Sequence, residues 1–204
     1  MIILGIDPGT LVMGYAVISC SGSAISFVRM DVFNMKRVKN TTEKLGLIHE
    51  KIISLIDEYH PDEVSIESPF YGKNPQSLIK LGRAQGVAIA AALSKGIPVY
   101  EYAPLKIKQS ITGRGRATKE QIWAMLVRIL GLNDVTVPHY LDASDALGAA
   151  VCHRLQFRVD GSGRIVAAGA GQAMGIGKVA GAGNRKKTSW QQFVSANSNR
   201  IVKI

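Results

Sequence analysis

The sequence predicts an α/β domain with a five-stranded mixed sheet and helices on both faces. Three observations predict this class. The chain begins with an apolar run, residues 2–6, that a Pro-Gly turn soon closes, which is typical of a strand buried on both sides. Two further strand patterns follow directly, and helical patterns then alternate with two short strand patterns. The 204 residues suffice for one such domain and an appendage.

The first strand ends at a charged residue, Asp7, which precedes the turn signal Pro8-Gly9. A charge at the end of a buried strand costs free energy unless it has a partner. Two interpretations stay open on these residues alone. Asp7 caps the turn by accepting backbone N–H bonds from Gly9 or Thr10, or it holds a metal or a reacting group at the end of a central strand.

The next segments predict an antiparallel meander and then a helix. Strands are expected at residues 13–19 and 24–33, joined by a turn at Ser21-Gly22. The Asn-Thr-Thr-Glu sequence at residues 40–43 is typical of a helix start. One stripe of that helix is apolar and consists of Leu45, Ile48, Ile52, Leu55, Ile56 and Tyr59.

From residue 63 onward short strands and longer helices alternate. The helix near residues 75–95 is rich in Gly and Ala, a composition that permits close packing against its own sheet or against another helix. Both interpretations stay open. The expected elements are a strand at 63–67, a loop at 68–74, the helix at 75–95, a strand at 98–102, and three helices at 104–110, from Thr118 onward, and from residue 141 or 142 to about 156.

Composition divides the chain into a folded part, residues 1–158, and a C-terminal segment, residues 159–204. Residues 161–186 are rich in Gly and Ala and have no apolar periodicity, so we expect a flexible linker there and a basic tail after it. The net charge is +10 and the pI is about 9.8. Residues 155–204 hold eight Lys or Arg and a single acid, which favours nucleic acid as a partner.

Cysteine usage and hydropathy exclude two classes of protein. Cys20 and Cys152 are far apart and have no CxxC spacing or His-rich surroundings, so neither a disulfide framework nor a zinc site is expected. No apolar run approaches the roughly 18 residues of a membrane span, and the N-terminus lacks the basic segment of a signal peptide. We therefore expect a cytoplasmic protein.

Three further acids occupy positions from which they could meet Asp7. Asp142 and Asp145 are three residues apart at the start of a helix and therefore share a face near its positive end. By themselves they are better explained as ordinary helix-start acids, but the helix around them is almost wholly apolar. Glu67 ends a strand that should lie beside the first one, at the edge where α/β sheets place ligands.

Four acids gathered at one edge would repel one another, and divalent cations are the usual remedy. All the candidate ligands are oxygens, which points to Mg²⁺ or Mn²⁺. A pair of such ions about 4 Å apart is a familiar phosphodiester-cleaving arrangement. His139 lies close in sequence, but we interpret it as a loop residue.

Four segments, taken in order, resemble one known family. IDPGT at residues 6–10, IESPFYGKN at 66–74, IKQSITGRGRATKEQ at 107–121 and LDASDALGAAVCH at 141–153 are similar to RuvC, the family of bacterial Holliday-junction resolvases. The resemblance covers roughly residues 2–154. It implies a ribonuclease H-like catalytic domain over residues 1–158 and an endonuclease that resolves four-way junctions by paired, symmetric nicks in DNA recombination and repair.

The resemblance also implies roles for particular residues and partners. Phe70 matches a loop aromatic that stacks on bases, and Lys108 and Lys119 match basic residues near the scissile phosphate. The resemblance further implies a homodimer and cooperation with a branch-migration motor, RuvA and RuvB. From the acids themselves we expect two Mg²⁺ per subunit. The metal-binding catalytic acids of the family are matched by Asp7, Glu67, Asp142 and Asp145.

The residues themselves support a DNA interface. The stretch from Lys106 to Lys119 has five cations and no acid, and its glycines let it conform to a nucleic-acid backbone. In isolation, that stretch would be better interpreted as a solvated basic loop. Aromatic rings on the Gly/Pro loop beside Glu67 can stack on unpaired bases. The predicted DNA contacts are Phe70, Tyr71, Lys73, Lys108, Arg114, Arg116 and Lys119.

Three other functions have to be separated from junction resolution. An actin-like ATPase shares the first motif but needs two such domains around a nucleotide. A related nuclease would act on RNA or on other branched DNA, and a junction-binding protein would not cleave at all. The basic tail extends beyond the resemblance, and we expect it to add sequence-independent DNA contact or to touch a partner.

Overall fold

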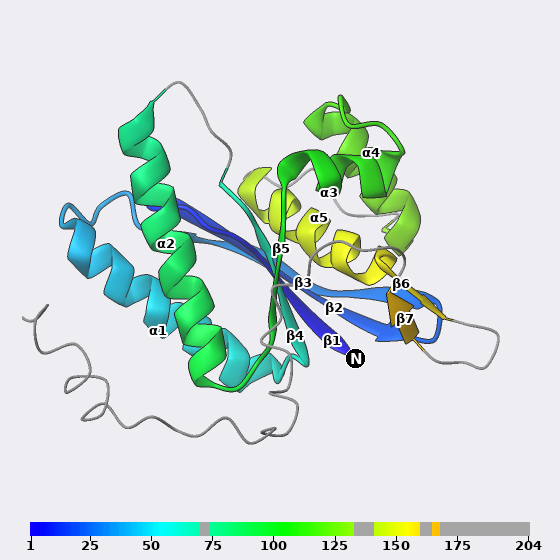
Figure 1. Ribbon diagram of the computed structural model, residues 1–204, viewed down its shortest axis with the longest axis horizontal. Coiled ribbons are helices and arrows are strands. Elements are labelled where there is room, and N and C mark those ends of the chain that lie inside the picture. The colour runs from blue at the N-terminus through cyan, green and yellow to red at the C-terminus, as the bar shows by residue number, and fades with distance from the viewer. Residues whose placement is uncertain (70–73, 133–140, 160–164, 168–204) are drawn as a thin grey trace, which may run out of the picture.

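A five-stranded sheet lies between two helical layers in the computed structural model, which describes residues 1–69, 74–132, 141–159 and 165–167 (Figure 1). Helices α1 and α2 cover one face, and α3, α4 and α5 lie on the other. The elements are β1 (Ile2–Asp7), β2 (Val12–Ser21), β3 (Ala24–Asn34), α1 (Thr41–Tyr59), β4 (Glu63–Glu67), α2 (Pro75–Ser94), β5 (Val99–Tyr102), α3 (Pro104–Thr112), α4 (Lys119–Leu130), α5 (Leu141–Leu155), β6 (Phe157–Val159) and β7 (Ile165–Ala167).

The main sheet is mixed and has the strand order β3-β2-β1-β4-β5. The first three strands pair antiparallel, as the predicted meander requires. β4 and β5 then add in parallel to β1. Because β1 and β4 run in the same direction with Ile6 opposite Ile66, their last residues, Asp7 and Glu67, lie at the same edge of the sheet.

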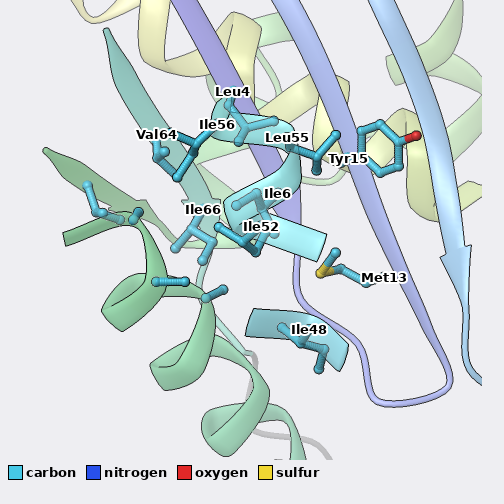
Figure 2. Close-up of a cluster of buried hydrophobic side chains, with 14 of the residues drawn as sticks. Leu4, Ile6, Met13, Tyr15, Ile48, Ile52, Leu55, Ile56, Val64 and Ile66 are labelled. Atoms are coloured by element: carbon cyan, nitrogen blue, oxygen red, sulfur yellow. The ribbon is translucent and has the colours of Figure 1, made fainter. Parts of the chain in front are cut away.

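Alternation along β1 and β4 sends even-numbered and odd-numbered side chains to opposite faces. The even-numbered residues pack with apolar side chains of α1 and with four alanines of α2. Figure 2 shows much of this cluster, in which Ile52 of α1 lies beside Ile6 and Ile66 of the strands and Ile48 lies farther along the helix. The odd-numbered side chains therefore face α5.

Helix α5 approaches its face of the sheet closely because glycines lie beneath it. A Cβ on Gly5 would collide with the carbonyl oxygen of Ala146, and a Cβ on Gly14 would collide with that of Asp142. The helix itself contributes small side chains to this contact, because Ala146, Ala149 and Ala150 are fully buried. This close contact sets the position of the N-terminal turn of α5.

Some of the small residues of α2 pack against the protein's own sheet, which was one of the two open interpretations. Ala84, Ala88, Ala91 and Ala92 are fully buried in the core shared with α1 and the sheet. Gly82 and Gly86 instead have open space where a Cβ would stand. The role of α2 in a dimer stays a prediction.

One short segment inside the predicted linker, residues 161–186, forms a strand instead, whereas the division of the chain after residue 158 stays a prediction. β7 pairs antiparallel with β6, with Arg158 opposite Val166. The hairpin thus crosses the boundary predicted after residue 158. Of the predicted C-terminal segment, residues 159–204, the structure describes only Val159 and residues 165–167. Within the described part of the chain, no helix is long and apolar enough to cross a bilayer.

Candidate active site

Three of the four predicted acids converge. Carboxylate oxygens of Asp7, Asp142 and Asp145 all lie within 4.8 Å of one another. Asp7 comes from the end of β1, and the two others come from the first turns of α5. The contact of Gly14 with the Asp142 backbone brings that turn against the sheet edge. The metal-site interpretation of Asp7 is therefore favoured over the turn-cap interpretation.

The fourth acid, Glu67, lies at the same cavity but outside the group of three. β4 carries it two residues after Ser65 and four after Glu63, so all three side chains face α5. Ser65 donates a hydrogen bond of 2.7 Å from Oγ to the Ala149 carbonyl. The strand is thus fastened to the helix that carries two of the acids, which orients Glu67 toward the cluster.

Burial and mutual repulsion make these acids weak. Burial, reinforced by the charges of Asp145 and Asp142, raises the pKa of Asp7 to about 7. Burial, together with the charges of Asp7 and Asp145, raises the pKa of Glu67 to about 8. Shifts of this size are typical of functional sites. Asp7 and Glu67 are therefore partly protonated near neutral pH.

One predicted lysine already supplies positive charge. Lys119, the first residue of α4, donates a hydrogen bond of 2.6 Å from Nζ to Oδ2 of Asp145. The capping box formed by Thr118 and Gln121 fixes the start of α4 and so the origin of this side chain. Burial lowers the pKa of Lys119, but the hydrogen bond and the charge of Asp145 raise it on balance.

The acids form one side of a cavity of about 820 Å³. It lies at the carboxyl ends of β1 and β4, where ligands bind in α/β sheets. Lys119 lines it together with four lysines that the sequence analysis did not single out: Lys36, Lys39, Lys44 and Lys80.

Two sequence signals could have revealed the missed lysines. The segment Met35–Lys39 has three cations in five residues just before a helix start. Lys44 lies four residues before Ile48 and eight before Ile52, so it occupies the apolar stripe of α1. A charged residue on a buried stripe needs a reason, as did the acids of α5.

The chemistry of the donor set fits a hard divalent cation. Three carboxylates within reach of one another, with a fourth at the same cavity, offer only oxygen ligands. Such ligands suit Mg²⁺ and Mn²⁺ and do not suit zinc, which prefers nitrogen and sulfur. A bound cation would also favour the ionised form of the two weak acids.

The remaining predicted DNA contacts divide into three groups. Lys108 of α3 is half-buried, and its charge acts on Glu67 by lowering that residue's pKa. Arg114 and Arg116 are exposed in the connection between α3 and α4, and neither is among the described residues that line the cavity. Phe70, Tyr71, Lys73 and His139 lie outside the described residues.

A buried polar network holds the far end of α5. His153 is fully buried, and its Nε2 lies 2.6 Å from Oε2 of Glu63. Its Nδ1 lies 2.7 Å from the hydroxyl of Tyr102. The network links α5 to β4 and β5, the elements beside the catalytic edge. The sequence analysis did not predict this network, because His153 lies at the opposite end of α5 from Asp142 and Asp145 and is connected to the site only by the helix itself.

Comparison with known proteins identifies the family of the chain. A profile of the family described as Crossover junction endodeoxyribonuclease RuvC matches residues 3–153. The protein of that name from Cytophaga hutchinsonii is 56% identical over 155 residues, which is 76% of this chain and 76% of that protein. The one from Bacteroides fragilis is 45% identical over 200 residues, which is 98% of this chain and 95% of that protein.

A solved structure is similar as well. The structure described as Thermus thermophilus RuvC in complex with Holliday junction substrate has a TM-score of 0.70 and 31% identity, and the match covers 76% of this chain and 93% of that chain. The fold is ribonuclease H-like, as predicted. The chain belongs to the RuvC family, whose members are named crossover junction endodeoxyribonucleases.

Proposed function

We propose that this protein is a metal-dependent endonuclease that resolves four-way DNA junctions by paired, symmetric nicks. One observation carries the proposal: Asp7, Asp142 and Asp145 converge at the carboxyl ends of the parallel strands β1 and β4, in a chain of the RuvC family. The cavity around them is lined by lysines, as a site for a polyanion requires.

The four acids are proposed to hold Mg²⁺, two ions per subunit, with Mn²⁺ as a substitute. When bound, such ions activate a water and stabilise the leaving 3′ oxygen. The residues of this chain prepare the site for that chemistry. Asp7 and Glu67 would give up their protons where a cation binds, and Lys119 orients Asp145 through its hydrogen bond.

The basic and aromatic residues near the cavity are proposed to hold the junction. Lys108 and Lys119 place positive charge beside the acids, where the scissile phosphate would lie. Exposed Arg114 and Arg116 would contact the backbone of an arm. Phe70, Tyr71 and Lys73 follow Glu67 within six residues in the sequence, so their loop would meet bases at the junction centre.

Symmetric nicking requires two sites, and we propose a homodimer. A four-way junction has pseudo-two-fold symmetry, so an isologous pair would place identical sites on opposed strands. The exposed Ile79 and the open glycines of α2 make this helix a reasonable interface. Cooperation with a RuvA and RuvB motor in the cytoplasm completes the proposal, and it rests on family membership.

The decisive experiment is junction cleavage by an Asp7→Asn variant. The amide keeps the shape of the side chain but removes the charge that a cation needs, so nicking in Mg²⁺ should fall by at least about 1000-fold, roughly 4 kcal/mol of barrier. Binding of the junction in EDTA should be kept. Asp57→Asn, which removes an exposed acid paired with Lys95, is the matched control and should cleave normally.

Two outcomes would contradict the proposal. Full cleavage by Asp7→Asn would remove this residue from the site, and loss of binding as well as cleavage would assign it a structural role. The substrate class is tested on a panel of four-way junctions, forks, flaps and RNA–DNA hybrids. Preference for any member other than the four-way junction would favour a related nuclease.

A further inference from the structure

The cavity has two chemically different sides, which come from the two helical layers. The acids belong to β1, β4 and α5. The other side is cationic and belongs to the α1–α2 layer and its connection from β3. Its lysines are Lys36, Lys39, Lys44 and Lys80.

Lys44 differs from the other three because it is buried. Its relative exposure is 9%, whereas Lys36, Lys39 and Lys80 are exposed. It forms part of the cavity wall. Within the described part of the chain, no carboxylate pairs with its ammonium group and no hydrogen bond engages it. The stem of the side chain is therefore buried, whereas its ammonium nitrogen is not among the buried polar atoms and opens onto the cavity, where it is available to an anion.

The start of α1 supplies a second feature of the same kind. Thr41, the first residue of this 19-residue helix, also lines the cavity. Thr41 precedes Lys44 by about one turn, so the positive end of the helix dipole lies at the cavity wall beside Lys44. Asn40 Oδ1 already accepts from the amides of Thr42 and Glu43, so the helix end adds its dipole to the charge of Lys44, and both favour an anion such as phosphate.

We propose that Lys44 and the N-terminus of α1 form a second phosphate subsite, which holds a phosphodiester of the DNA strand whose scissile phosphate lies at the acids. This inference rests on the proposed function. Phosphates follow one another at about 3.4 Å of rise on each strand, so a cavity of about 820 Å³ admits neighbours of the reacting phosphate. The exposed lysines extend the positive surface along that strand.

The subsite solves an electrostatic problem of the catalytic side. Acids that collect cations repel every DNA phosphate other than the one those cations hold. A fixed ammonium group on the opposite wall attracts the next phosphate and thereby sets the strand's direction across the acids. Lys44 is accordingly a positioning residue, and its effect should be on DNA binding before the chemical step.

The test compares Lys44→Met with Lys44→Arg and with a matched control, Lys51→Met. Lys51 lies two turns later on α1 and contacts the ring of Tyr15 instead of the cavity. Binding of a four-way junction is measured in EDTA at several salt concentrations. For Lys44→Met we expect about tenfold weaker binding and a salt slope smaller by about 0.9, the loss of one phosphate contact. Lys44→Arg and Lys51→Met should resemble the wild type.

Thermal unfolding separates this role from a structural one. Lys44→Met removes a cation that has no carboxylate partner among the described residues and keeps the apolar stem, so the melting temperature of the free variant should be equal to or above that of the wild type. A lower melting temperature with an unchanged salt slope would overturn the subsite. If Lys44→Met does not fold, Lys39→Gln, at an exposed position, should still reduce the slope, and an unchanged slope there would overturn the proposal equally.

Wild-type cleavage of the same junction in Mg²⁺ is recorded in parallel. Absence of cleavage would contradict the proposed function, whereas the salt slopes, which need no cleavage, report on the subsite alone. Wild-type cleavage together with an unchanged affinity and slope for folded Lys44→Met would overturn the subsite and leave the proposed function standing.

Discussion

Asp7 and Glu67 keep their protons to a higher pH in the folded protein than in the unfolded chain. Burial and neighbouring carboxylates raise the pKa of Asp7 to about 7 and that of Glu67 to about 8. Between about pH 4 and pH 8 the folded state therefore binds more protons than the unfolded state. The contribution of these residues to the free energy of unfolding is present at low pH and is lost as the pH rises through these values.

This linkage predicts how stability depends on pH and on metal. Without divalent cations, the melting temperature should fall between pH 5 and pH 8, and Mg²⁺ should restore it at pH 8, because a cation replaces the protons. Asp7→Asn should flatten the pH dependence and weaken the effect of Mg²⁺. Thermal unfolding of both proteins in EDTA and in Mg²⁺ measures this, with Asp57→Asn as a control. An unaltered pH dependence in Asp7→Asn would contradict it.

At the scale of elements, the site depends on how closely α5 lies against the sheet. The helix carries Asp142 and Asp145 at one end and His153 at the other. Gly14 beneath its first turn and the bond from His153 to Glu63 fix these two ends. The geometry of the acid cluster is therefore a consequence of helix–sheet packing, since small shifts of α5 move two acids at once.

A methyl group under α5 tests that dependence. Gly14→Ala places a Cβ against the carbonyl of Asp142, so the helix start must shift. We expect a loss of about 1–3 kcal/mol in the free energy of unfolding and a fall of about 100-fold in junction cleavage. Urea unfolding and single-turnover cleavage measure the two effects.

Gly46→Ala is the matched control for that change. Gly46 lies within α1 with open space around the added atom. This substitution should raise stability by about 0.5–1 kcal/mol through helix propensity and leave cleavage intact. Wild-type cleavage by Gly14→Ala would show that the acids tolerate displacement of α5.

At the scale of the whole molecule, the positive charge is divided between the folded part and the tail. Residues 168–204 hold six Lys or Arg and no acid. The lysines around the cavity belong to the folded part and lie where a strand would meet the acids. The two sets are expected to act differently, because the tail adds affinity for any DNA whereas the cavity orients one strand.

Removal of the tail should therefore weaken binding without altering chemistry. A chain that ends at Ala167 keeps the hairpin of β6 and β7, which a chain ending at Arg158 would break. We expect weaker junction binding and a smaller salt slope, with unchanged single-turnover cleavage at saturating DNA. An unchanged affinity and salt slope would exclude the tail from DNA contact.

The sequence by itself predicted the five strands of the main sheet, the helices and the candidate acids, but not the β6–β7 hairpin. Apolar periodicity, the turn at Pro8-Gly9 and the caps at Asn40 and Thr118 are local features, so they could be interpreted without knowledge of the fold. The oxygen-only character of the candidate ligands likewise needed no coordinates. Glu67 and Asp7 could be placed together because parallel neighbours end at one edge of a sheet.

Only the tertiary structure decided what faces those acids. Lys44 and Lys80 belong to different helices, and both reach the cavity only because α1 and α2 pack side by side on one face of the sheet. The contact between Lys119 and Asp145 joins residues 26 positions apart. Local periodicity assigns a side chain to a face of its own element, but the opposing wall of a cavity is set by how the layers pack.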